Sequence, residues 1–300
     1  MLERQEQFPV MPNNNQHPLP LRDAYAHCMK MARSHYENFP VASVLLPKHL
    51  REPISVIYAF ARTADDFADE GDALPAVRLA QLDVYVSHLD TLKLGGTVDD
   101  PVFMALEDVI KKHALPLELF YDLLTAFRMD VTKSRYASQA EVLHYCRYSA
   151  NPVGRLLLYL YNLATPVNLA QSDAICSALQ IINFLQDMTQ DYHEQGRIYL
   201  PQDDMARFGV TEEHIRTAHS DAAMRALMNH VINRTRQMML FGAPLGNTLP
   251  GRIGFELRMT IQGGLRILNA LQAQHDDVFA RPRLGMGDWL KMIATASFKK

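Results

Sequence analysis

Residues 180–201 read QIINFLQDMTQDYHEQGRIYLP, and this stretch decides the fold that we expect. On an α-helix its polar residues fall three and four positions apart, and after eleven residues the pattern returns to within about 20° of its start. This polar stripe consists of Gln180, Asn183, Asp187 and Asp191. Apolar residues such as Ile181 and Phe184 flank it, as on a buried helix. Because buried carboxylates are costly unless they are neutralised, the stripe predicts a site for a hard divalent cation.

The end of the same stretch adds a cation. Gly196 is expected to end the helix, and Arg197 follows it directly, where its guanidinium suits an anionic ligand. The chain therefore pairs acidic residues with an arginine, which is an arrangement that a metal-bound diphosphate would need.

A second acidic stripe lies upstream, in residues 58–70, YAFARTADDFADE. Asp65 and Asp69 share a helix face at a spacing of four residues, Asp66 and Asp69 at a spacing of three, and Arg62 lies one turn earlier. One run of this kind is usually a solvated helix face. Two such runs, each with apolar neighbours and an arginine, favour two facing helices that hold Mg²⁺ ions and through them a diphosphate.

Composition restricts the function further. The chain has 300 residues, of which 48% are hydrophobic and 21% charged, and its formal net charge is −3. These values are typical of a globular protein and give no reason to expect a nucleic-acid partner. The three cysteines, Cys28, Cys146 and Cys176, are widely separated, match no metal-ligand pattern and favour a reducing compartment.

The termini and apolar runs favour a cytoplasmic protein. The N-terminus has no apolar signal-peptide core. The longest uncharged stretch, 156–172, is interrupted by Asn162 and Pro166 and is expected to be a buried helix rather than a membrane span. Association with a membrane surface stays open. Residues 1–20 are rich in Gln, Asn and Pro and are expected to form a loose leader, and 21–300 a single domain.

We expect an all-α fold, because no segment shows the alternation of a β-strand. Asp173 is expected to cap the helix that carries the stripe at 180–191, Asn151-Pro152 to break the chain, and 242–251 to form a loop. The expected helices are 21–32, 52–70, 75–94, 100–113, 117–130, 138–150, 156–172, 173–195, 203–208, 211–218, 222–240, 253–276 and a short one around Trp289.

Four blocks of this sequence, at 35–39, 58–70, 145–154 and 180–201, carry a resemblance to a known family. Over residues 22–290 the chain resembles the squalene/phytoene synthases, the head-to-head branch of the trans-prenyl diphosphate synthases. Within that family it is most similar to the bacterial hydroxysqualene synthases of hopanoid and squalene biosynthesis. The features in common are SANPVGR at 149–155, Gln186 where many relatives have Arg, and the glycine-containing segments at 242–246 and 264–266.

The resemblance implies an isoprenoid synthase fold, a single helical bundle around a central cavity. It implies Mg²⁺ ions held by Asp65, Asp66, Asp69, Asp187 and Asp191 with the help of Asn183, and catalysis that depends on Asp65, Asp69, Asp187, Asp191 and Tyr145. The implied reaction starts from presqualene diphosphate, ionises it, rearranges the carbocation and quenches it with water to give hydroxysqualene. No nicotinamide is needed for that reaction.

Physical chemistry assigns the remaining candidate residues. A departing diphosphate needs cations, for which Arg62, Arg197 and Lys48 are candidates. A carbocation needs a dry, apolar and aromatic pocket. The candidate lining residues are Phe39, Tyr58, Tyr145, Leu156, Leu157, Phe184 and Tyr199. Each of these side chains, taken singly, is more often core packing.

Several assignments keep alternatives. His35 is expected to bind the diphosphate or to make a structural hydrogen bond, and Gln180 to contact the substrate. Tyr145 could orient either a water molecule or the departing oxygen. Arg281 and Arg283 could close over the diphosphate, although decoration of the tail is favoured.

The function also keeps alternatives. A close variant would condense two farnesyl diphosphates to presqualene diphosphate or squalene, or two geranylgeranyl diphosphates to phytoene. A protein of another class would be a non-catalytic helical partner that binds prenyl diphosphates or a sister synthase, which the presence of all five aspartates disfavours. The expected partners are a prenyl diphosphate, a partner synthase of the same pathway and, because the product is so apolar, the surface of a membrane.

Overall fold

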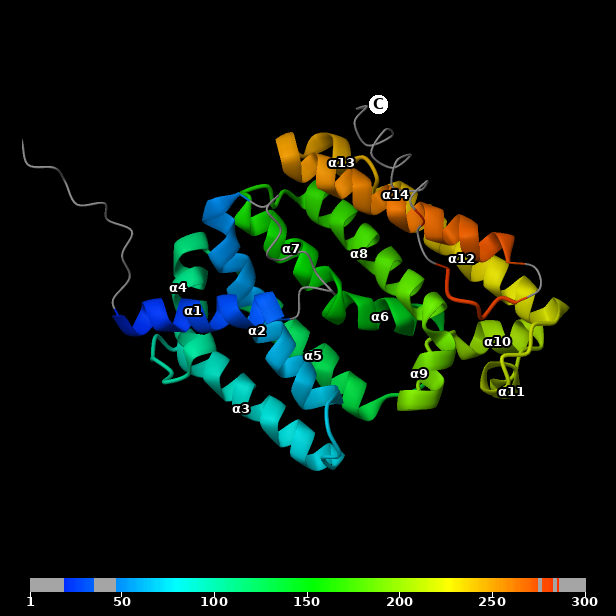
Figure 1. Ribbon diagram of the computed structural model, residues 1–300, viewed down its shortest axis with the longest axis horizontal. Coiled ribbons are helices and arrows are strands. Elements are labelled where there is room, and N and C mark those ends of the chain that lie inside the picture. The colour runs from blue at the N-terminus through cyan, green and yellow to red at the C-terminus, as the bar shows by residue number, and fades with distance from the viewer. Residues whose placement is uncertain (1–18, 35–46, 275–276, 283–284, 286–300) are drawn as a thin grey trace, which may run out of the picture.

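The computed structural model describes residues 19–34, 47–274, 277–282 and 285, and within them the fold is all-α (Figure 1). In chain order the helices are α1 (Leu19–Ser34), α2 (Lys48–Asp69), α3 (Pro75–Lys93), α4 (Pro101–His113), α5 (Glu118–Thr132), α6 (Gln139–Ser149), α7 (Asn151–Leu160), α8 (Pro166–Gln186), α9 (Met188–Gln195), α10 (Gln202–Phe208), α11 (Glu212–Arg216), α12 (Ala222–Gly242), α13 (Leu245–Thr248) and α14 (Gly251–Ala273). No strand forms in this part of the chain, although Arg135 and Ile198 make an isolated parallel bridge.

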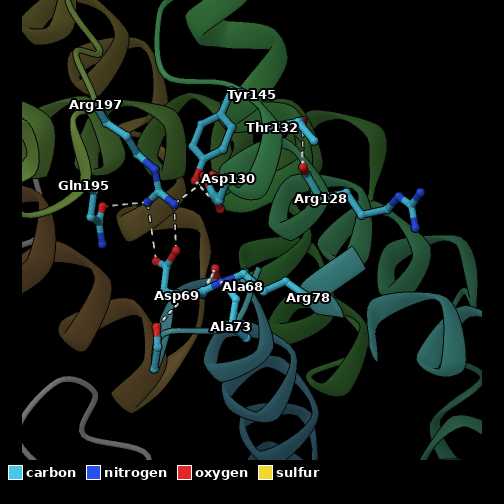
Figure 2. A network of polar contacts seen from close by, with 11 residues as sticks. Ala68, Asp69, Ala73, Arg78, Arg128, Asp130, Thr132, Tyr145, Gln195 and Arg197 are labelled. Atoms are coloured by element: carbon cyan, nitrogen blue, oxygen red, sulfur yellow. Dashed lines mark hydrogen bonds and ion pairs between the residues drawn. The ribbon is translucent and has the colours of Figure 1, made fainter. Parts of the chain in front are cut away.

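The buried apolar side chains form two clusters. The first joins α1–α5 with two leucines of α7, and aromatic rings fill its centre, where Phe60 meets Phe120 at a centroid distance of 5.3 Å. The second joins α6, α8, α12 and α14 with the segment after α9. Helix α5 contacts both α2 and α6, so its two faces serve both clusters. Asp69, Asp130, Tyr145 and Arg197, which come from both groups of helices, lie close together (Figure 2).

Helices α8 and α12 lie side by side in the second cluster, and α14 covers both (Figure 1). Helix α14 contains the glycine pair Gly263-Gly264, which is compatible with close packing or with a bend. Close packing is what the structure has, because a Cβ on Gly264 would lie 2.8 Å from Met239 Cε and 3.2 Å from Ile182 Cδ1. A side chain there would require the ends of the Met239 and Ile182 side chains to shift, so α14 packs closely on α12 and α8 at this point.

Most helix starts follow the sequence signals. Asp100 caps α4, because its carboxylate accepts hydrogen bonds from the Val102 and Phe103 amides at 2.8 and 3.1 Å. Ser138 caps α6 by accepting from the Glu141 amide. The Glu141 carboxylate accepts from the Ala137 amide, one residue earlier than a capping box requires.

The expected buried helix over 156–172 and its neighbour were wrong in detail. Helix α7 ends at Leu160, and α8 begins at Pro166 behind the cap Thr165. Proline is well suited to a first helical position and disfavours helix in the residue before it, so it divides the stretch. Asp173 therefore lies inside α8 and is not its cap. Its carboxylate accepts hydrogen bonds from Arg155 of α7 at 2.8 and 2.5 Å.

The second acidic stripe was also expected on one helix, and the structure divides it. Helix α8 ends at Gln186, Asp187 has φ −107° and ψ 11°, and α9 begins at Met188. The hydrogen bonds continue across this kink, since the Asp187 amide donates to Asn183 O at 2.9 Å and the Asp191 amide to Asp187 O at 2.8 Å. Gly196 ends α9 at φ +64°, as predicted.

Two smaller differences concern the C-terminal half and the ends. The expected loop over 242–251 contains the short helix α13. Residues 1–18 of the expected leader (1–20), the 35–39 block and the helix around Trp289 lie outside the described residues, and the division into a leader and one domain stays a prediction.

Candidate active site

The first acidic face carries its own counter-ion. Arg62 Nη2 lies 2.7 Å from Asp66 Oδ1, Arg62 Nη1 lies 3.6 Å from Asp65 Oδ2, and the guanidinium also contacts Glu70. These pairs follow from the three- and four-residue spacings on α2. Partial burial and the charge of Asp69 together raise the pKa of Asp65 to about 6. Arg62 therefore leaves this face with an excess of negative charge.

The second acidic face takes its counter-ion from a distant part of the chain. Arg281 Nε lies 2.8 Å from Asp187 Oδ1, and its Nη2 donates to Oδ2 at 3.2 Å. Gln186 donates to the Pro282 carbonyl at 3.0 Å, so the segment around Arg281 is held against the kink between α8 and α9. The sequence favoured a mere tail for Arg281, and the structure corrects this. Burial and the charge of Asp187 raise the pKa of Asp191 to about 7.

Arg197 links the first acidic face to the segment that follows the second, and Figure 2 shows its contacts with Asp69, Gln195 and Asp130. Its buried guanidinium donates to Asp69 at 2.7 and 3.4 Å, to Gln195 Oε1 at 2.6 Å and to the Asp130 main-chain carbonyl at 2.8 Å. Asp69 belongs to α2 and Arg197 to the segment after α9, so this pair brings the two stripes to one place. The negative charge of Asp69 contributes to the raised pKa of Asp191, as expected for neighbouring carboxylates.

Backbone pairing delivers Arg197 and Tyr199 to this place. The Ile198 amide donates to Ser134 O and the Gln202 amide to Tyr136 O, both at 2.9 Å, so the segment after α9 runs beside the α5–α6 connection. Arg135, in the α5–α6 connection, adds a bidentate ion pair with Glu212 at 2.7 and 2.8 Å.

An aromatic cluster adjoins the acidic faces. The rings of Phe184 and Tyr199 stack at a centroid distance of 3.6 Å. Tyr145 lies 5.9 Å from Phe184, 5.8 Å from Tyr199 and 5.8 Å from Tyr136. Such rings supply both an apolar wall and the negative π-faces that stabilise a cation. The structure thus brings together three of the predicted lining residues.

A small cavity lies beside this cluster. Its walls include Phe184 and Tyr199 together with Asp191, Arg197 and Arg234, and its volume is ≈ 20 Å³. That is room for about one water molecule. Asp191 of the second acidic face, Arg197 and two rings of the aromatic cluster therefore border the same interior space.

Asp130 belongs to the site, and the sequence analysis missed it. Its Oδ2 accepts a hydrogen bond from the Tyr145 hydroxyl at 3.1 Å, and burial raises its pKa to about 7. A signal existed. Asp130 follows Leu123 by seven residues and Phe127 by three on α5, which places a carboxylate on the inward face of that helix.

The other predicted residues divide into three groups. Asn183 is exposed and Gln180 half-buried on α8, while Tyr58 is half-buried on α2, one turn before Arg62. Leu156 is fully buried in the first cluster, so it does not line the cavity beside Phe184, and Leu157 packs against the same cluster. Lys48 begins α2, about 20 Å along the axis from Arg62, and does not join the acidic residues. His35, Phe39 and Arg283 lie outside the described residues.

The acidic side chains stand paired with arginines. Among the described residues, no group of three or more His, Cys, Asp or Glu side chains lies close enough together to hold a metal ion. Arg62, Arg197 and Arg281 contact four of the five predicted ligands, namely Asp65, Asp66, Asp69 and Asp187.

An all-α fold in which two acidic helix faces meet beside an aromatic cluster defines this molecule as an isoprenoid synthase in architecture. The sequence model of the squalene/phytoene synthases matches residues 32–289, and the chain belongs to that family, whose members act on prenyl diphosphates.

Named relatives agree with this family. Hydroxysqualene synthase of Rhodopseudomonas palustris is 39% identical over 79% of this chain and 80% of its own length. The hydroxysqualene synthase of Zymomonas mobilis is 35% identical over 87% of both chains. The crystal structure of a squalene synthase from Alicyclobacillus acidocaldarius is 36% identical, with a TM-score of 0.80, and covers 87% of this chain and 97% of the other. In the described part of the chain, no helix is long and apolar enough to cross a membrane.

Proposed function

We propose that this protein converts presqualene diphosphate to hydroxysqualene by ionising the diphosphate, rearranging the carbocation and quenching it with water. The observation that carries the proposal is the junction at Arg197, where two acidic faces and an aromatic cluster come together. The likeness to hydroxysqualene synthases supports the choice of product.

The donor set fits Mg²⁺. Five carboxylates on two neighbouring faces supply the hard oxygen ligands that this ion prefers, and Asn183 is exposed on the same stripe. Burial, and after it the charge of a neighbouring aspartate, raises the pKa values of Asp65 and Asp191, so a bound cation would favour the ionised form of both. When bound, Mg²⁺ would supply the positive charge that meets the growing charge of a departing diphosphate.

Arg62, Arg197 and Arg281 would act on the same anion, the departing diphosphate. Arg62 and Arg281 lie at the edges of the two faces, with side chains that are 21% and 52% exposed, so both can move onto a ligand. Arg197 is held on three sides and is 8% exposed, which suits a fixed donor that keeps the faces together. An ionising diphosphate then meets cations at fixed places, which is the main source of rate enhancement in such reactions.

The aromatic cluster would protect the carbocation that remains after the diphosphate has left. Phe184, Tyr199 and Tyr145 pack against one another, and the cavity that Phe184 and Tyr199 line has room for about one water molecule. A dry pocket lets the cation rearrange before it is quenched, while a single admitted water suffices to form the alcohol.

The experiment is a product analysis. Purified protein with Mg²⁺ is incubated separately with presqualene diphosphate, farnesyl diphosphate and geranylgeranyl diphosphate, without NADPH, and the products are identified by mass spectrometry. We expect hydroxysqualene from presqualene diphosphate alone. Condensation of farnesyl or geranylgeranyl diphosphate would instead assign the first half-reaction or phytoene synthesis. If no substrate is consumed, the non-catalytic binding partner gains support.

A further inference from the structure

Asp130 is a buried carboxylate with an unusual set of contacts. It lies on the last turn of α5 (Glu118–Thr132), and its Oδ1 is buried with no hydrogen-bond partner in the described part of the chain. Its Oδ2 accepts a hydrogen bond from the Tyr145 hydroxyl at 3.1 Å, and its main-chain oxygen accepts one from Arg197 at 2.8 Å (Figure 2). A buried, partly unsatisfied carboxylate costs stability, so its presence here points to a role beyond packing.

Tyr145 is a neutral phenol in this setting. Burial and the negative charge of Asp130 raise the pKa of the Tyr145 hydroxyl well above its usual value. A phenol has one hydrogen to donate, and here that hydrogen is given to Asp130. The lone pairs of the Tyr145 oxygen remain, so the hydroxyl can accept a further hydrogen bond but cannot donate one to a departing diphosphate.

This geometry decides between the two roles that the sequence left open for Tyr145. Resting on the proposed function, we propose that Asp130 is a positioning residue that orients the Tyr145 hydroxyl to accept a hydrogen bond from the quenching water. Tyr145 therefore acts on the water side of the reaction and not on the leaving group.

The step balances as a proton relay. A lone pair of the water oxygen forms the new C–O bond to the carbocation. The oxonium so formed gives one proton to the Tyr145 oxygen, while the Tyr145 hydroxyl proton passes to the Asp130 carboxylate. The cation becomes an alcohol and Asp130 becomes neutral. A carboxyl whose pKa is raised to about 7 by burial is well suited to receive a proton at neutral pH.

Two variants remove the two halves of the relay. Tyr145→Phe deletes only the hydroxyl and keeps the ring contacts. Asp130→Asn keeps the shape and the main-chain carbonyl that Arg197 binds but removes the charge. With presqualene diphosphate we would measure diphosphate release in a single turnover and, separately, the fraction of product that is the alcohol.

The expected result is a change of product and not of ionisation. In either variant diphosphate release stays within about threefold of the wild type, while the ratio of alcohol to elimination and rearranged products falls about tenfold, as loss of a hydrogen bond to a charged group allows. The double variant should match Tyr145→Phe alone, because two residues that act as one unit are not additive.

The chain offers a matched control. The Tyr25 hydroxyl donates to Asp108 Oδ2 at 2.6 Å between α1 and α4, and both residues lie in the first cluster of helices. Tyr25→Phe removes the same kind of hydrogen bond from a site without substrate. We expect this variant to lose stability while its product ratio stays that of the wild type.

Other outcomes overturn the inference in distinguishable ways. Slower diphosphate release with an unchanged product ratio would place Tyr145 on the leaving group, and additive effects would make Asp130 independent of Tyr145. If Asp130→Asn fails to fold, Tyr145→Phe alone decides whether Tyr145 acts on the water or on the leaving group. A wild-type protein that does not consume presqualene diphosphate would overturn the proposed function and this inference together.

Discussion

The two acidic faces of the molecule reach similar chemistry by different routes. The face on α2 (Lys48–Asp69) is local, because Arg62, Asp65 and Asp66 are neighbours on one unbroken helix. The other crosses the kink at Asp187 between α8 and α9, and its counter-ion is Arg281, 94 residues away. The ion pairs of the first face therefore follow from helical spacing, whereas the ion pair of the second face forms only when distant parts of the chain meet in the fold.

The largest effect should come from the second face. Asp187→Asn removes one of the two carboxylates of this face, so we expect turnover to fall about 10³-fold, the upper range for loss of one electrostatic contact in an active site. The circular dichroism spectrum and the melting temperature should change little, because Asp187 is partly exposed. Undiminished turnover would remove this face from the site.

Next in size is the loss of the junction between the faces. Arg197→Met keeps much of the apolar stem but leaves Asp69 without its partner and Asp130 O without a donor. Breaking such a pair should lower the free energy of unfolding by about 2–3 kcal/mol, below the value for a fully buried pair because the Asp69 side chain is 27% exposed. Urea denaturation measures this loss. A change under 0.5 kcal/mol, about that of an exposed surface pair, would contradict the role of Arg197 as a fixed link.

A smaller effect is expected at the local face. Arg62→Met removes ion pairs that are partly exposed and that neighbours on the same helix share. The free energy of unfolding should fall by about 1 kcal/mol or less. The same urea measurement compares it with Arg197→Met, and an equal loss in the two variants would erase the distinction between the local ion pairs of Arg62 and the long-range contacts of Arg197.

The smallest effect on stability belongs to Arg281. Its side chain is 52% exposed, so Arg281→Ala should change the free energy of unfolding by about 0–1 kcal/mol. Activity should respond more, with a raised KM for presqualene diphosphate, if Arg281 moves onto the diphosphate. Lys111→Ala, which removes another exposed cation on α4, serves as the control and should leave KM unchanged.

Much of the fold could be predicted because its signals are local. The spacing of Asp65 and Asp69, the αL conformation at Gly196 and the cap at Ser138 all depend on a few neighbouring residues. The all-α class follows from the same periodicity. The division at Pro166 is also a local signal, although the uncharged run 156–172 around it favours one continuous helix.

The rest depended on contacts between distant residues. The kink at Asp187 contains no proline or glycine, so no residue type in the sequence predicted it. The pairs of Arg197 with Asp69 and of Arg281 with Asp187 span 128 and 94 residues. Asp130 occupied an inward position on α5, but its partner Tyr145 is on another helix, and only the fold shows that the two meet.

The most direct test asks whether the two faces form one diphosphate-binding site. Binding of inorganic diphosphate would be measured by calorimetry with and without Mg²⁺, for the wild type, Asp66→Asn and Asp187→Asn. We predict Mg²⁺-dependent binding that weakens about tenfold or more in each variant, since each would remove one of the ligands proposed for a shared Mg²⁺ ion. Binding that does not depend on Mg²⁺, or that weakens in only one of the two variants, would contradict a single site built from both faces.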